Sequence, residues 1–211
     1  MLKLLLYALT MIGFYGYSQQ QPVVLSTYVL QNFSKGTVKV KSGVTSSQVL
    51  NYNMLTGEMV YDNNGKYLAI ANPEDVDTVF IEGRKFIPVE KRFYEWLTGK
   101  EDPLFVDYTC SIREPGVETG FGTTRTTSAA ALRNLINSGM AYQLKLPSDY
   151  EVVQSRSYYI KKKYQYFKIN SASKLVKLYP EKKKIIDKWI KENNTSFQKG
   201  EEVIALINAI H

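Results

Sequence analysis

Residues 51–89 read NYNMLTGEMVYDNNGKYLAIANPEDVDTVFIEGRKFIPV, a series of short apolar segments separated by turn residues. Asn64-Gly65 and Glu82-Gly83 stand between consecutive segments, and glycine reaches the positive φ of a tight hairpin turn without a Cβ clash. Strands joined this closely pair antiparallel, because a parallel pair needs a long crossover. The segments that we expect to be strands here are residues 58–62, 66–71, 77–81 and 84–89.

The same pattern continues on both sides of this region. Residues 37–41, TVKVK, alternate apolar and polar side chains with the period of a half-buried strand. The further segments expected to be strands are residues 37–41, 49–55, 93–97, 104–112, 142–146 and 151–169. Together they predict an antiparallel β-meander, either an open curved sheet or a partial barrel. A Gly/Thr-rich loop over residues 114–128 and a short helix over 129–139 interrupt the series.

The C-terminal part of the chain changes its period from two to that of a helix. We expect helices over residues 171–179, 181–193 and 199–210, with Pro180 at the start of the second helix. A chain in which a sheet comes first and the helices follow is typical of an α+β fold. Here the fold is predicted to be an antiparallel meander followed by a helical C-terminal segment. The chain is therefore divided into a β-rich domain over residues 19–169 and a basic helical segment over residues 170–211, packed on or beside it.

The N-terminus has the features of a Sec-type signal peptide over residues 1–18. Lys3 precedes a run of about 14 apolar residues, and Gly16 and Ser18 are small residues at the −3 and −1 positions of a cleavage site. The alternative is a retained anchor, but the run is short against the roughly 20 residues that span a bilayer. We expect cleavage after Ser18 and a periplasmic or secreted protein without a stable transmembrane span. The only cysteine, Cys110, lies far from this site, so the protein is not expected to be a lipoprotein.

Charge is distributed unevenly along the chain. Residues 156–211 hold 13 lysines and arginines against five acidic residues, whereas residues 19–155 hold 13 against 15. A basic C-terminal part on a near-neutral body indicates a surface that meets an anionic partner. An anionic envelope component or an acidic protein is the expected partner. An exported protein rarely meets nucleic acid, and we predict none as a ligand.

The candidate binding surface is the basic and aromatic stretch over residues 158–168, YYIKKKYQYFK. Aromatic rings in such a stretch stack on flat ligands, and lysines pair with phosphates or other anions. The alternative is a solvated edge strand, in which lysines prevent edge-to-edge aggregation. The residues predicted to form the surface are Tyr158, Lys161, Lys162, Lys163, Tyr164 and Tyr166.

Catalytic and metal-binding sites find little support in the sequence. His211 is the only histidine and is the last residue, which argues against Ser-His-Asp and Cys-His nucleophilic systems and against most transition-metal sites. The glycine loop over residues 120–125 lacks the third glycine or the Gly-Lys-Ser/Thr ending of a phosphate loop. We predict a non-enzymatic protein with no cofactor, no catalytic residue and no metal. The alternatives are a carboxylate-dependent hydrolase acting on a glycan or cell-wall polymer, and a carrier of a small apolar ligand.

Three segments carry a resemblance to known proteins. Residues 35–43 (KGTVKVKSG), residues 51–89 and residues 174–193 (KLVKLYPEKKKIIDKWIKEN) resemble a set of uncharacterised exported proteins from Bacteroidota. Those proteins combine a β-rich front with a lysine-rich helical tail. The resemblance implies an envelope or secreted location. It implies no activity and no site residues.

Overall fold

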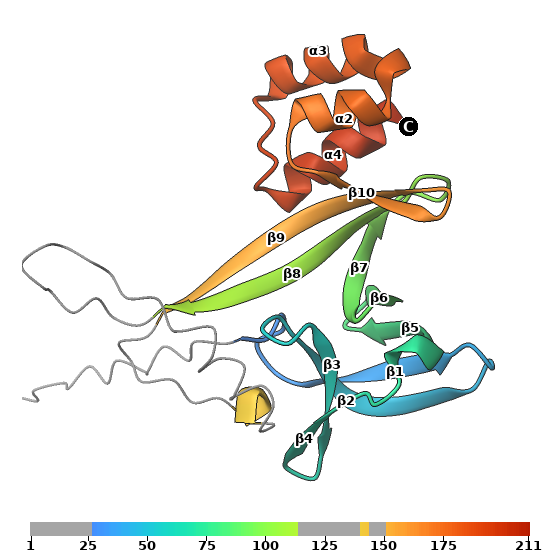
Figure 1. Ribbon diagram of the computed structural model, residues 1–211, viewed down its shortest axis with the longest axis vertical. Coiled ribbons are helices and arrows are strands. Elements are labelled where there is room, and N and C mark those ends of the chain that lie inside the picture. Colours follow the sequence, from blue (N-terminus) through green and yellow to red (C-terminus); the bar gives the residue numbers. More distant parts are fainter. Residues whose placement is uncertain (1–26, 114–139, 144–150) are drawn as a thin grey trace, which may run out of the picture.

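The computed structural model describes residues 27–113, 140–143 and 151–211. Within these residues ten strands form one antiparallel sheet in the order β10-β9-β8-β7-β6-β5-β1-β2-β3-β4 (Figure 1). The strands are β1 (Ser34–Val40), β2 (Thr45–Asn53), β3 (Glu58–Asn63), β4 (Lys66–Ala69), β5 (Val76–Ile81), β6 (Arg84–Val89), β7 (Arg92–Thr98), β8 (Leu104–Arg113), β9 (Glu151–Lys162) and β10 (Gln165–Ile169). Since β10 and β4 form two separate edges, the sheet is open rather than closed into a barrel.

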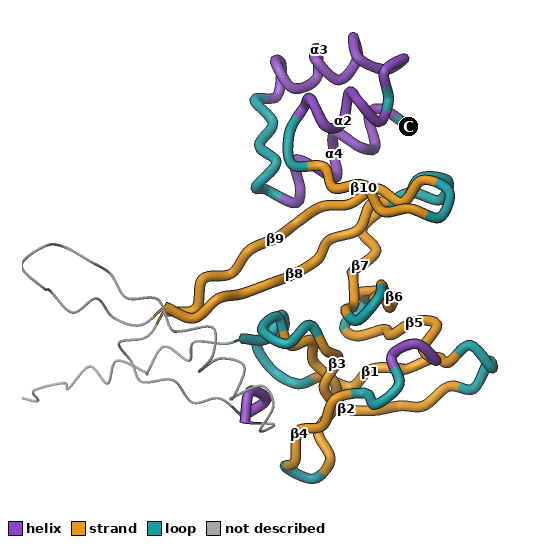
Figure 2. Tube along the Cα trace, in the orientation of Figure 1, coloured by secondary structure: helices purple, strands orange, loops and turns teal. Residues whose placement is uncertain are grey.

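The helices follow the sheet in sequence and gather at one end of it (Figure 2). They are α2 (Ala172–Leu178), α3 (Lys183–Asn193) and α4 (Gly200–Ile210), with the short 3-10 helix η3 (Pro180–Lys182) before α3. The predicted α+β fold class, an antiparallel sheet followed by a helical C-terminal segment, is confirmed. The signal peptide over residues 1–18, the loop over 114–128 and the helix over 129–139 lie outside the described residues.

Two tight turns follow the sequence prediction closely. Asn64 and Gly65 have φ of 53° and 84°, and Glu82 and Gly83 have φ of 49° and 73°. Positive φ at both central residues is the property of the hairpin turns that match the twist of the flanking strands. These turns set the register of β3 with β4 and of β5 with β6.

The connection from β4 to β5 departs from consecutive pairing. β5 does not pair with β4 but with β1, whose other edge pairs with β2. The 3-10 helix η1 (Pro73–Asp75) turns the chain back toward β1, and the Lys41 amide donates to the Asp75 carbonyl over 2.8 Å. β1 is therefore a central strand, and its buried Val38 belongs to the core.

A second difference concerns residues 142–146, expected to be a strand. Tyr142 and Gln143 belong to the 3-10 helix η2 (Met140–Gln143), and the remainder of the segment is not described. Tyr142 is held by partners distant in sequence, which override local β propensity. Its carbonyl accepts from the Tyr28 hydroxyl and its own hydroxyl donates to Glu58, both over 2.7 Å.

The buried apolar side chains form two hydrophobic cores. Both cores lie on one face of the sheet, which we call the inner face. Side chains paired across neighbouring strands share a face. One such row on the inner face runs across seven strands through Val38, Val79, Phe86, Glu95, Val106, Tyr158 and Ile169. The row begins in a strand core around β1, β2, β5 and β6 and ends in a helical core beneath the helices.

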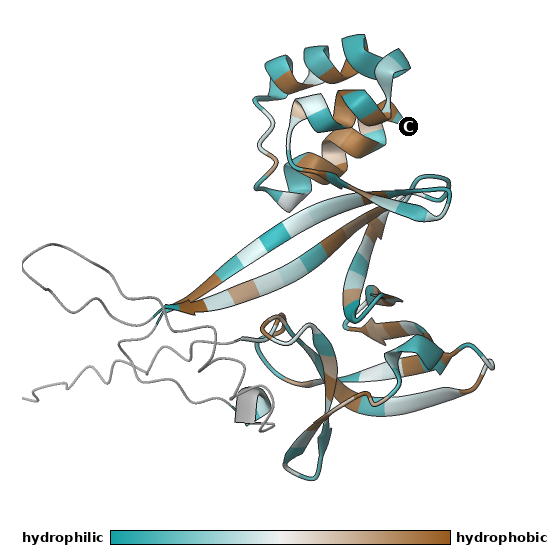
Figure 3. Ribbon diagram, in the orientation of Figure 1, coloured by the Kyte–Doolittle hydropathy of each residue, from teal (hydrophilic) through white to brown (hydrophobic). Residues whose placement is uncertain are grey.

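The helical core holds α2, α3 and α4 against β8, β9 and β10. Apolar residues concentrate on α4, whereas α3 carries hydrophilic bands (Figure 3). Ile186 of α3 and Leu206 of α4 are fully buried there. Ser171 caps α2 by accepting from the Lys174 amide, and Asn194 ends α3 in the left-handed conformation with φ of 47°. The helices thus cover the inner face at this end and leave the opposite, outer face of the strands uncovered by them.

Candidate functional site

A row of aromatic and lysine side chains crosses the outer face of the sheet. Strand register places Phe80 beside Lys85, Lys85 beside Trp96, Trp96 beside Phe105, Phe105 beside Tyr159, and Tyr159 beside Lys168. The row alternates with the inner-face row, residue by residue, in every strand from β5 to β10. With Tyr94, Lys161 and Tyr166 next to it, we call this set the aromatic surface.

Ring contacts hold the aromatic surface together. Tyr94 stacks on Tyr159 at 5.1 Å between centroids, and Tyr166 meets the ring of Tyr94 edge-on at 5.8 Å. Phe105 lies between Trp96 at 5.4 Å and Tyr166 at 5.5 Å. Such pairs contribute beyond their buried area and limit the freedom of the rings. The rings of the surface therefore hold one another in place.

Two of the three lysines of this surface lie over its rings. Lys85 Nζ is 3.7 Å from the centre of the Trp96 ring, and Lys161 Nζ is 5.5 Å from the centre of the Tyr166 ring. Lys168, at the β10 end of the row, is exposed. Cation–π contacts of this kind orient a lysine without neutralising its charge. An anion that approaches the rings thus meets positive charge already in position.

Most of the aromatic surface reaches solvent. Phe80 is 43% exposed, an unusual value for a phenylalanine, and Tyr94, Trp96, Tyr159 and Tyr166 are half-buried. Phe105 lies beneath them and is buried. Exposed aromatic groups that adjoin one another, rather than single scattered ones, mark interaction sites.

The structure separates the residues that the sequence grouped. Lys161 and Tyr166 pair with each other on the outer face. Tyr158 lies on the inner face under α4 and is only 2% exposed. Lys162 turns toward the helices, with Nζ 4.4 Å from the Tyr179 ring centre and 3.3 Å from the Leu178 carbonyl oxygen.

The two remaining predicted residues, Lys163 and Tyr164, form the turn between β9 and β10. Lys163 adopts a positive φ of 56°, and Tyr164 is 94% exposed. Sequence reasoning missed the other members of the aromatic surface, which are Phe80, Lys85, Tyr94, Trp96, Phe105, Tyr159 and Lys168. Tyr159 and Lys168 lie within the stretch it selected, and strict alternation along β9 separates Tyr159 and Lys161 from Tyr158 and Ile160.

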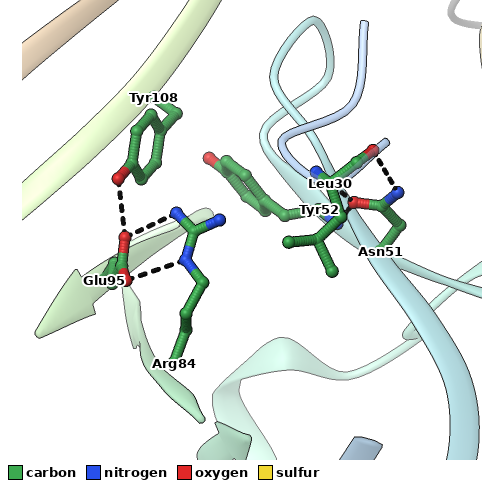
Figure 4. A network of polar contacts seen from close by, with 6 residues as sticks. All are labelled: Leu30, Asn51, Tyr52, Arg84, Glu95 and Tyr108. Carbon is green, nitrogen blue, oxygen red and sulfur yellow. Dashed lines mark hydrogen bonds and ion pairs between the residues drawn. The ribbon is translucent and has the colours of Figure 1, made fainter. Parts of the chain in front are cut away.

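A polar junction lies on the inner face between the two cores (Figure 4). Arg84 donates from Nε and Nη2 to the two carboxylate oxygens of Glu95 over 2.8 and 2.7 Å, and the Tyr108 hydroxyl donates to Glu95 over 2.6 Å. Burial, together with the nearby Glu95, raises the pKa of Tyr108 well above its ordinary value. With every carboxylate oxygen occupied, this junction is suited to stability rather than to proton transfer.

A second ion pair lies where β7 separates from β8. The two strands pair only from Glu95 to Thr98, so the Tyr108 carbonyl needs another donor. Arg92 Nη2 supplies it over 2.9 Å, while Arg92 Nε donates to Asp107 over 3.0 Å. Burial raises the pKa of Asp107, and Arg92 opposes this effect. Glu95 lies on the inner face of the sheet and Asp107 on the outer face, so the two carboxylates do not line one common cleft.

The second polar contact drawn in Figure 4 anchors the chain before β1. Asn51 Nδ2 donates to the Leu30 carbonyl over 2.9 Å, and the Leu30 amide donates to Asn51 Oδ1 over 3.0 Å. Asn51 is 1% exposed. These bonds satisfy both backbone polar groups of Leu30, next to the backbone bridge between Tyr28 and Asn53, which is a structural role.

The single cysteine of the chain, Cys110, lies on β8. Cys110 packs against the strand core and is free. Burial raises the pKa of its thiol from an ordinary 9.0 to about 11, against a smaller opposite effect of Arg92. The thiolate, which is the reactive form, is therefore scarce at neutral pH.

Comparison with protein-family models, with curated proteins and with solved structures finds no match to this chain. In the residues that the structure describes, no helix is both long and apolar enough to cross a membrane. The same residues contain no group of three or more His, Cys, Asp or Glu side chains that could hold a metal ion.

Proposed function

We propose that this protein is a non-enzymatic binding protein of the cell envelope, and that its aromatic surface holds an anionic glycan. The observation that carries the proposal is the register of β5 to β10, which aligns Phe80, Lys85, Trp96, Phe105, Tyr159 and Lys168 in one row. Half-buried rings offer flat apolar area, and the lysines beside them offer charge.

The dimensions and chemistry of the row favour an extended ligand. Neighbouring strands are about 4.8 Å apart, so a row across six strands measures roughly 24 Å. Sugar rings have an apolar face that stacks on an aromatic ring, and their carboxylate or phosphate substituents pair with lysines. An acidic protein would need matched apolar contacts as well as charge. We therefore favour a linear anionic glycan that lies across the strands.

The envelope location in this proposal rests on the leader over residues 1–18. We expect protein isolated from cells that produce the full chain to begin at Gln19, because signal peptidase cleaves after small residues at −3 and −1. N-terminal sequencing or intact-mass measurement checks this. Recovery of the chain from the cytosol with Met1 intact would contradict export.

Ligand binding can be followed through Trp96. The chain has two tryptophans, so a Trp189→Phe background leaves Trp96 as the single reporter. We expect polygalacturonate to change Trp96 fluorescence saturably and uncharged dextran to leave it unchanged. Raising the salt concentration from 0.05 to 1 M (values chosen for the assay) should weaken binding, because the Debye length falls to about 3 Å at 1 M.

Substitutions on the row test the same surface. Lys85→Ala should weaken binding severalfold in the reporter chain. Trp96→Ala, measured by calorimetry, should weaken it about 5- to 150-fold, since each stacked ring contributes about 1–3 kcal/mol. Lys188→Ala is the matched control, because Lys188 is an exposed lysine on α3. Equal effects of Lys85→Ala and Lys188→Ala would refute the assigned surface.

A further inference from the structure

A hollow of about 510 Å³ lies between the inner face of the sheet and the first turn of α4, on the side opposite the aromatic surface. Its volume is within the range of small-molecule sites. The residues that line it are Leu97, Tyr108, Arg156, Tyr158, Gln198, Lys199, Gly200, Glu201, Glu202 and Ile204. The hollow thus combines apolar side chains, one arginine and a helix N-terminus.

The N-terminus of α4 has no side-chain cap in the described structure. Lys199 occupies the cap position and makes no capping hydrogen bond, and the first intrahelical bond runs from the Val203 amide to the Lys199 carbonyl. The amides that precede Val203 in the helix therefore have no helical acceptor. Aligned amides of this kind favour an anion, because the helix dipole adds to their own partial charges.

The Tyr158 hydroxyl is an independent sign of a missing ligand. Tyr158 is 2% exposed, and its oxygen is buried with no hydrogen-bond partner of acceptable geometry among the described residues. It lies against the first turn of α4, since a Cβ placed on Gly200 would be 3.1 Å from this oxygen. A buried polar group left unpaired destabilises a protein, so native structures rarely keep one without a reason.

Arg156 brings the positive charge to this hollow. It precedes Tyr158 by two residues on β9, so both side chains project from the same face of the strand. Burial raises the pKa of Tyr158, and the neighbouring Arg156 guanidinium counteracts this. Arg156 also approaches the Tyr108 ring, with Cζ 5.8 Å from its centre. Guanidinium and phenol thus lie next to each other beside the first turn of α4.

We propose that this hollow binds a carboxylate carried on a small apolar body. The guanidinium of Arg156, the hydroxyl of Tyr158 and the first amides of α4 donate to the carboxylate, and Leu97 and Ile204 contact the apolar part. A planar carboxylate matches the fork of an arginine better than a spherical anion does. The ligand is either a free carboxylic acid or the C-terminus of a peptide, which share this chemistry.

The two acidic residues of the hollow determine how much negative charge a ligand can carry. Glu202 is already occupied, because its carboxylate accepts from the Ser196 amide over 2.7 Å and from Lys199 Nζ over 2.9 Å. Glu201 is exposed at the rim and opposes a bound anion. A ligand with several negative charges is therefore disfavoured relative to a single carboxylate.

Amide NMR of the full chain tests the proposal, with N-acetylleucine as the probe and N-acetylleucinamide as its uncharged match. We expect N-acetylleucine to shift the Gly200 and Glu201 amide resonances saturably, and the amide probe to leave them in place. A tripeptide that ends in a free leucine carboxylate distinguishes a peptide C-terminus from a free carboxylic acid as the ligand. Tighter binding of the tripeptide indicates a peptide C-terminus, and equal binding indicates a free acid.

Three variants establish which groups act. Arg156→Gln should weaken N-acetylleucine binding at least tenfold, Tyr158→Phe should weaken it about fivefold, and Glu201→Gln should strengthen it severalfold. Lys188→Gln on α3, which does not line the hollow, should change nothing. Equal shifts with both acetyl probes, or full binding by a folded Arg156→Gln variant, would overturn the proposal. Because the aromatic surface lies on the other face, this result is independent of glycan binding.

Discussion

Replacing Glu95 with alanine is expected to lower the free energy of unfolding by about 3 kcal/mol. Glu95 is 7% exposed, and its two carboxylate oxygens accept three hydrogen bonds from Arg84 and Tyr108. Removal of the carboxylate leaves a guanidinium and a phenol without their acceptor. We place the loss at the lower end of the range for buried pairs because the Arg84 side chain retains 25% exposure. Urea denaturation followed by circular dichroism measures it.

An exposed ion pair provides the matched control for this variant. Lys188 and Glu192 lie 3.9 Å apart on α3 with side chains 74% and 60% exposed. Glu192→Ala should change stability by no more than about 0.5 kcal/mol, because exposed pairs contribute little. A double variant with Arg84→Met and Glu95→Leu should recover most of the loss, since no buried charge then lacks a partner. A Glu95→Ala loss no larger than that of Glu192→Ala would contradict a structural role for the junction.

Replacing Leu206 with alanine should destabilise the protein by about 3–5 kcal/mol. Leu206 is fully buried in the helical core, where α4 packs on the sheet. The substitution removes apolar contact and leaves a cavity that the surrounding side chains fill only in part. The midpoint of urea unfolding, at an unchanged slope, gives the measurement.

Ile185→Ala on α3 tests whether burial is the cause. Ile185 is 52% exposed, so the same kind of truncation should cost less than about 1 kcal/mol. Trp189 packs against the helical core and reports its unfolding by fluorescence. If Leu206→Ala lowered the free energy of unfolding by no more than Ile185→Ala does, the result would contradict the packing of α4 on the sheet.

Local sequence patterns predicted most of the strands and all of the C-terminal helices. Asn64-Gly65 and Glu82-Gly83 identified their turns because glycine chemistry is a local property. The turn at Lys163 was missed, and residues 151–169 read as one stretch. Lysine carries no turn preference, and tertiary pairing of β9 with β10 imposes the positive φ there.

The candidate site was predicted only in part. Lys161 and Tyr166 were selected for their composition, and both lie on the aromatic surface. Trp96 and Phe105 were assigned to strands but not to a surface, because their neighbours come from other strands. The hollow at α4 was not foreseen at all, since it joins Arg156 and Tyr158 of β9 with the start of a helix more than forty residues later in the chain.

By itself the sequence determined the alternation within each strand, the helical period at the C-terminus and the uneven charge, and it predicted a leader over residues 1–18. These depend on residues close together in the chain. Only the tertiary structure decided that β5 pairs with β1, that Tyr158 is buried while Tyr159 reaches the outer face, and that Trp96 lies between Lys85 and Phe105. The physical reason is register: a shift of one residue in any pairing would exchange the two faces, and contacts between distant segments set that register.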